Sequence, residues 1–167
     1  GRVAEMARYH KQTRAVLGVS NAVMEPLLRD WRRSLPLPER IALADALWRS
    51  DIFEARIAAA KLLTQARMKP AAQEAAAWHL VASWVPEFDG WAIADHAAMA
   101  GQRRLSAVPE RLDEVEAWTA AARMWTRRAA LVMTLPWARM RHPAAEDAAR
   151  RARILGWAAG YLDDPDR

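Results

Sequence analysis

An acidic residue and an aromatic residue stand one helical turn apart near the middle of the chain. Asp95 follows Trp91 by four positions, and residues with that spacing lie on the same face of an α-helix. A carboxylate fixed beside an indole ring can stabilise positive charge that develops on a reacting group, and the face of the ring attracts cations. Trp91 and Asp95 are therefore the first candidates for a catalytic site.

An internal repeat places arginine on both sides of this pair. The segments that begin at Phe53 and at Trp125 share one pattern: an aromatic residue, two variable residues, Arg, an apolar residue and Ala. Phe88 lies 35 positions after Phe53 and 37 before Trp125, so the period is about 36 residues, in the range of helical-hairpin repeats. Arg56 and Arg128 occupy equivalent positions in the outer copies.

The middle copy departs from the other two. It has Trp91 where they have Arg, and Asp95 where they have small apolar residues. Because equivalent helices lie side by side in such a stack, the pattern predicts a groove in which arginines flank the Trp/Asp pair. The alternative is purely structural: Asp95 pairs with Arg104 or Arg128, and Trp91 packs against its neighbours.

The surrounding sequence predicts helices alone. Its hydrophobic periodicity is helical, alternating strand patterns are missing, and Ala, the best helix former, is abundant. We expect an all-α protein, an α-α superhelix of helical hairpins that forms a single domain over residues 1–167. The expected helices cover residues 3–11, 21–33, 39–49, 51–66, 70–84, 89–104, 109–121, 124–135 and 144–162.

The amino-acid composition excludes several kinds of functional site. The absence of Cys excludes disulfides, thiolate zinc sites and a Cys nucleophile. The four His residues lack the spacing of metal ligands and no glycine-rich loop precedes a helix, so we expect neither a metal nor a cofactor. No uncharged stretch is long enough to span a membrane. The nine Trp residues either fill a core lined with Ala or line a site.

Basic residues favour an anionic partner. The chain has 25 Lys+Arg against 20 Asp+Glu, a net charge of +5, and most of the basic residues are Arg, whose planar group binds phosphate oxygens in pairs. Arg127 and Arg128 form a set with the basic residues at 103–104, 150–151 and 153 that could meet DNA phosphates. Solvated helix faces would give the same pattern.

Three stretches of the chain resemble the AlkD-like DNA alkylation repair family, bacterial DNA glycosylases built from HEAT-like helical repeats. Residues 9–11 and 16–20 are similar to its N-terminal Tyr-x-Lys and Leu-Gly-Ile/Val segment. Residues 88–95 are similar to its Trp-x-x-x-Asp catalytic helix, and residues 125–130 to its Trp-x-x-Arg-Ala-Ala helix. The resemblance runs over nearly the whole chain.

The resemblance implies a role for each matched residue. Asp95 would be the catalytic carboxylate and Trp91 an aromatic wall beside the deoxyribose, while Arg128 would hold a backbone phosphate and Tyr9 would contact the backbone. We also expect Arg56 and Arg127 to contact DNA. The implied partner is double-stranded DNA, bound by a monomer in the cytoplasm.

A second aromatic wall comes from a later helix in the family. The Gln-Lys-Ala run that marks this helix does not precede Trp157, so we interpret Trp157 as a packing residue. We therefore expect the chain to lack the C-terminal repeat or repeats of the family.

Three functions stay open at this point. The first is hydrolytic excision of cationic purines alkylated at N3 or N7, with Asp95 stabilising the sugar cation and positioning water. The second is a non-catalytic DNA-binding relative on the same scaffold. The third is a helical-repeat scaffold that binds protein partners.

Overall fold

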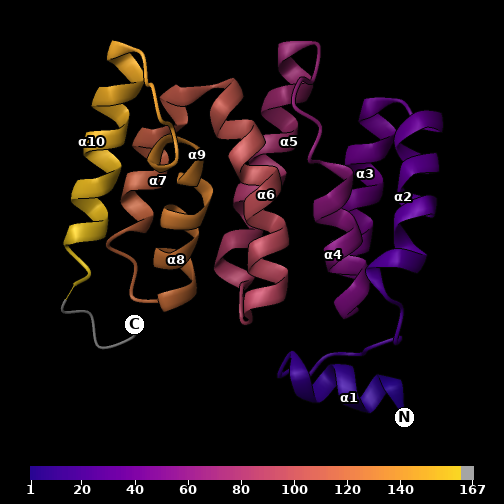
Figure 1. Ribbon diagram of the computed structural model, residues 1–167. Helices are drawn as coiled ribbons and strands as arrows, with labels where there is room; N and C mark the ends of the chain where they lie inside the picture. Colours follow the sequence, from indigo (N-terminus) through magenta and orange to yellow (C-terminus); the bar gives the residue numbers. More distant parts are fainter. Residues whose placement is uncertain (163–167) are drawn as a thin grey trace.

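The computed structural model describes residues 1–162 and is all-α within that range, as the sequence predicts (Figure 1). Two short 3₁₀ turns, η1 (Val85–Glu87) and η2 (Pro109–Arg111), connect longer elements. The α-helices are α1 (Arg2–Tyr9), α2 (Asn21–Ser34), α3 (Leu37–Arg49), α4 (Phe53–Leu62), α5 (Ala71–Trp84), α6 (Trp91–Ala107), α7 (Leu112–Trp118), α8 (Met124–Met133), α9 (Leu135–Ala138) and α10 (Ala145–Ala159).

The helices pair into hairpins that stack side by side (Figure 1). α3 packs against α4, α5 against α6, and α7 against α8. α4, α6 and α8 contact one another in that order and form one layer, while α3 and α5 pack together behind them. The three helices that carry the sequence repeat are therefore neighbours. This arrangement confirms the stacked-hairpin superhelix.

Tryptophans fill the interior of the second layer. Trp48 on α3 stacks on Trp84 on α5, with ring centroids 4.4 Å apart, and Trp78 on α5 stacks on Trp118 on α7 at 5.8 Å. Aromatic rings bury large apolar areas, so these pairs join consecutive hairpins. The packing interpretation of Trp is confirmed for these residues.

Small residues let the helices of the first layer approach one another. Gly101 on α6 lies against Met133 on α8, and a Cβ added at Gly101 would meet the Met133 sulfur at 2.4 Å. All three helices of this layer also carry buried alanines. These alanines are Ala58, Ala59, Ala60, Ala97, Ala98, Ala129 and Ala130.

Some helix ends differ from the prediction. The helix expected over residues 124–135 ends at Met133, because Pro136 lacks the N–H that would continue it, and α9 follows as a separate turn. The helix expected to reach residue 66 ends at Leu62. Asp89 does not begin α6, since Gly90 is the residue before the helix and the Asp89 carboxylate binds Arg14 instead.

Candidate active site

Trp91 and Asp95 lie on the first two turns of α6 and both reach the surface. Trp91 is 43% exposed and the side chain of Asp95 is 42% exposed. Trp48 and Trp84, by contrast, are buried. A large ring is usually buried in a folded protein, so the exposure of Trp91 marks this surface as a candidate site.

Arg128 on α8 is the partner of Asp95. Its Nη2 donates a hydrogen bond to Oδ1 of Asp95 at 2.7 Å, and its guanidinium carbon lies 5.9 Å from the centroid of the Trp125 ring. Both side chains are about 40% exposed, and exposed ion pairs contribute at most about 1 kcal/mol to stability. The pair is weak enough for another anion to compete for Arg128.

The C-terminal end of α1 extends the aromatic surface. The Tyr9 ring meets the Trp91 ring edge to face at 5.9 Å, and the His10 ring lies between Trp91 at 5.1 Å and Phe53 at 4.7 Å. Partial burial lowers the pKa of His10, although the charge of Glu54 opposes this shift. The His10 imidazole is therefore mostly neutral near pH 7. The resemblance predicted Tyr9 at the site, and we did not expect His10 there.

Glu54 holds the segment that follows α1. Its buried carboxylate accepts hydrogen bonds from the backbone N–H groups of Leu17, Gly18 and Val19 at 2.9, 2.8 and 3.2 Å. Gly18 has φ +79°, a conformation that favours glycine. A buried charge needs such donors. Glu54 was not among the residues expected at the site, although an acid among the apolar residues of α4 was an available signal.

Arg14 provides a second attachment for the same segment. Its Nε donates to Oδ1 of Asp51 at 2.8 Å, and its Nη1 donates to Oδ1 of Asp89 at 2.9 Å. Asp51 lies just before α4 and Asp89 just before α6. The N-terminal segment is therefore tied to both helices beside Trp91.

Arg56 is not part of this surface. It is 6% exposed, pairs with Asp51 at 3.0 Å and Glu87 at 2.7 Å, and lies 4.5 Å over the ring of Trp48. Arg56 occupies the same position in its repeat as Arg128 does, but neighbouring side chains cover the Arg56 guanidinium. We therefore leave Arg56 out of the proposed site, which corrects the expected row of Arg, Trp/Asp and Arg.

Arg127 supports the loop that leads into α8. Its Nη1 donates to the carbonyl oxygens of Ala121 and Ala122 at 3.1 and 2.8 Å. These bonds orient the chain just before Arg128. The structure brings Arg128, Trp91, Asp95 and Tyr9 together, and it places Arg127 beside them as a support.

The site combines a carboxylate, a guanidinium and aromatic rings on one surface. Among residues 1–162, no group of three His, Asp or Glu side chains is placed to hold a metal ion. In the same part of the chain, no helix has the length and apolar character needed to cross a bilayer. A guanidinium such as that of Arg128 can bind an oxyanion, and a carboxylate such as that of Asp95 can stabilise positive charge on a reacting group.

Comparisons with known proteins identify the family. A family model described as DNA alkylation repair enzyme matches residues 1–167. None of the curated proteins matches the chain, and none of the solved structures does. The match covers the whole chain, and it agrees with the all-α fold. The chain belongs to the DNA alkylation repair enzyme family.

Proposed function

We propose that the chain is a DNA glycosylase that removes purines alkylated at N3 or N7 from duplex DNA. The observation that carries the proposal is the exposed Asp95 carboxylate, 2.7 Å from Arg128 and one turn from the exposed ring of Trp91. Membership of the DNA alkylation repair enzyme family supports this class of substrate.

Asp95 acts on charge that develops at the sugar. Alkylation at N3 or N7 makes the purine cationic, so the base leaves with the electron pair of the N-glycosidic bond and becomes neutral. Positive charge then develops at C1′ and O4′, where a fixed carboxylate stabilises it. A water held by Asp95 forms the new bond to C1′ and releases one proton to the carboxylate or to solvent. The products are a free base and an abasic site.

Arg128 couples DNA binding to this carboxylate. In the DNA-free protein its guanidinium pairs with Asp95. A backbone phosphate offers two oxygens to the planar guanidinium, and the ion pair it must replace is worth at most about 1 kcal/mol. Transfer of Arg128 to a phosphate frees the Asp95 carboxylate where the backbone binds.

Trp91 and Tyr9 form the aromatic side of the site. The face of an indole attracts a cation by roughly 0.5–2 kcal/mol, and this attraction favours an alkylated base or a sugar cation over a neutral group. His10 backs the Trp91 ring and, being mostly neutral, does not repel that cation.

The test compares lesions of different charge. Duplexes that carry 7-methylguanine, a cationic lesion, or O6-methylguanine, a neutral one, are incubated with the intact chain, and the free base is measured by mass spectrometry. We expect release of 7-methylguanine above the spontaneous rate and no release of O6-methylguanine. Release of neither base above the protein-free rate would contradict the proposal.

The Asp95–Arg128 contact also favours a second candidate, a non-catalytic DNA-binding relative, because it keeps the carboxylate paired. The two candidates differ in one measurable respect. A non-catalytic relative binds the methylated duplex without releasing base at any protein concentration.

A further inference from the structure

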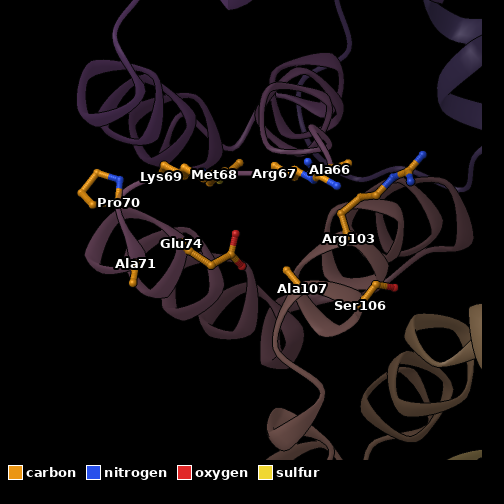
Figure 2. Close-up of a pocket in the computed structure, with 10 residues that line it drawn as sticks. All are labelled: Ala66, Arg67, Met68, Lys69, Pro70, Ala71, Glu74, Arg103, Ser106 and Ala107. Carbon is orange, nitrogen blue, oxygen red and sulfur yellow. The ribbon is translucent and has the colours of Figure 1, made fainter. Parts of the chain in front are cut away.

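A cavity on the far part of α6 gathers positive charge. It lies between the loop after α4 and the C-terminal turns of α6, and its volume is about 640 Å³ (Figure 2). Arg67, Lys69 and Arg103 line it together with the hydroxyl residue Ser106 and the acid Glu74. Figure 2 shows the Glu74 carboxylate facing the cavity, with Arg67 and Arg103 at one edge.

The three cations have no acidic partner among residues 1–162. All three side chains are exposed and line the cavity. Most of the other arginines in the described part of the chain form ion pairs or hydrogen bonds. Like charges that line one cavity repel one another, and a bound anion relieves that repulsion. The arrangement points to a ligand that supplies negative charge.

Glu74 does not supply that charge. Its Oε1 accepts a hydrogen bond from Arg111 at 2.8 Å, and its Oε2 accepts one from Arg104, which is fully buried. One carboxylate against two guanidinium groups leaves this triad with a net positive charge. The triad therefore adds to the positive potential of the cavity.

Buried contacts also fix the loop that carries the cations. Arg104 donates to the carbonyl oxygens of Gln65 and Ala66, and Arg40 donates to Oε1 of Gln65 at 2.7 Å. The Gln65 amide in turn donates to the carbonyl oxygen of Arg67. A side chain on a backbone that is already fixed loses less conformational entropy when a ligand binds.

The cavity continues the surface that carries Asp95. Met99 and Gln102 line a second hollow with Arg103 and Ser106, between the two sites. Ser106 follows Asp95 by eleven positions on α6, about three turns on the same face and about 16 Å along the axis. The major groove of DNA is about 12 Å wide, so a duplex with one strand at Asp95 brings its other backbone within reach of the cavity.

We infer that the cavity lined by Arg67, Lys69 and Arg103 binds a phosphate of the duplex backbone, on the strand opposite the one at Asp95. This inference rests on the proposed function, because that function places DNA on the α6 surface. The cavity fixes the position of the duplex and takes no part in bond cleavage.

The test measures how salt weakens binding to an undamaged duplex, so that a chain without glycosylase activity still gives a result. Fluorescence anisotropy over a series of KCl concentrations yields the slope of log association constant against log salt. Each phosphate contact contributes about 0.9 to that slope. We expect Arg103→Gln and Arg67→Gln each to reduce the slope, by no more than about 0.9 because the cavity holds a single phosphate. Arg29→Gln, which removes an exposed arginine from α2, is the matched control and should change it little.

Equal slopes for Arg103→Gln and Arg29→Gln would overturn the inference. A second arm titrates inorganic phosphate and follows the backbone amide signals of the loop by NMR. Phosphate binding that Arg103→Gln abolishes, together with an unchanged DNA slope, would assign the cavity to a small phosphate compound and would also overturn the DNA assignment.

Discussion

Asp95 on α6 and Arg128 on α8 meet at 2.7 Å across the contact between two neighbouring repeats. The contact exists because the middle repeat has an acid one turn beyond the position at which the outer repeats have Arg. The two residues lie in adjacent copies, so the stacking of the hairpins sets the distance between them. The same packing that stabilises the fold therefore positions the proposed catalytic carboxylate.

Replacement of Arg128 by Gln should weaken DNA binding without unfolding the protein. An exposed ion pair contributes at most about 1 kcal/mol, so the free energy of unfolding should fall by less than that amount. The salt slope of duplex binding should fall by about 0.9, the value of one phosphate contact. Arg49→Gln removes an arginine from another exposed pair and serves as the control. A slope equal to that of the control would contradict the role of Arg128.

Replacement of Trp91 by Ala should slow base release by roughly 2- to 30-fold, because an indole face contributes about 0.5–2 kcal/mol to binding a cation. Trp91→Phe should retain part of the rate, since its ring is a weaker cation partner. Single-turnover rates with 7-methylguanine DNA test this order. Trp157→Ala, which removes an indole that contacts Arg153 on α10, should leave the rate unchanged.

Replacement of Glu54 by Gln should loosen the N-terminal segment. The three backbone N–H groups of residues 17–19 would lose a charged acceptor in a buried place, at a cost of about 1–3 kcal/mol. Hydrogen exchange at these amides should accelerate, and urea unfolding should show the loss of stability. Glu39→Gln, on the exposed side of α3, is the control. Unchanged exchange at residues 17–19 would show that Glu54 does not hold the segment.

Stability should fall as the pH drops below the ordinary pKa of histidine. Burial, helped by the charge of Lys61, lowers the pKa of His96 below 6.5, although Asp95 opposes the shift, and burial also lowers the pKa of His10. The unfolded chain then binds more protons than the folded one in this range, so unfolding becomes easier as the pH falls.

Urea unfolding from about pH 7.5 to about pH 5.5 measures this dependence. His96→Gln should make the loss of stability shallower. His142→Gln, at an exposed loop position, should leave it as it is in the intact chain. If the free energy of unfolding of the intact chain rose as the pH fell over this range, the predicted direction of the pH dependence would be wrong.

Local sequence patterns predicted the hairpins and the Trp91/Asp95 pair because both depend on residues within one or two helical turns. The period of about 36 residues also predicted that Arg128 would lie in the helix next to Asp95. Helix ends were less well predicted, since Pro136 and the contacts of Asp89 with Arg14 depend on local breaks and distant partners.

The environment of each arginine could not be predicted from its register. Arg56 and Arg128 share one repeat position, yet Trp48 and Glu87 cover Arg56 while Arg128 stays half exposed. These covering residues come from other segments of the chain. His10 was missed for a related reason, because its contact with the ring of Trp91 depends on where the N-terminal segment packs.

The most direct measurement is the single-turnover rate of 7-methylguanine release by the intact chain and by Asp95→Asn, with protein in excess over DNA so that differences in affinity drop out. Asp45→Asn is the matched control, because Asp45 is also a half-exposed helical aspartate paired with an arginine. We expect Asp95→Asn to lower the rate by about 100-fold or more, the usual effect of removing one electrostatic group from an active site, and Asp45→Asn to match the intact chain. Equal rates for Asp95→Asn and the intact chain, with both proteins folded and bound to DNA, would contradict the assignment of Asp95 as the catalytic carboxylate.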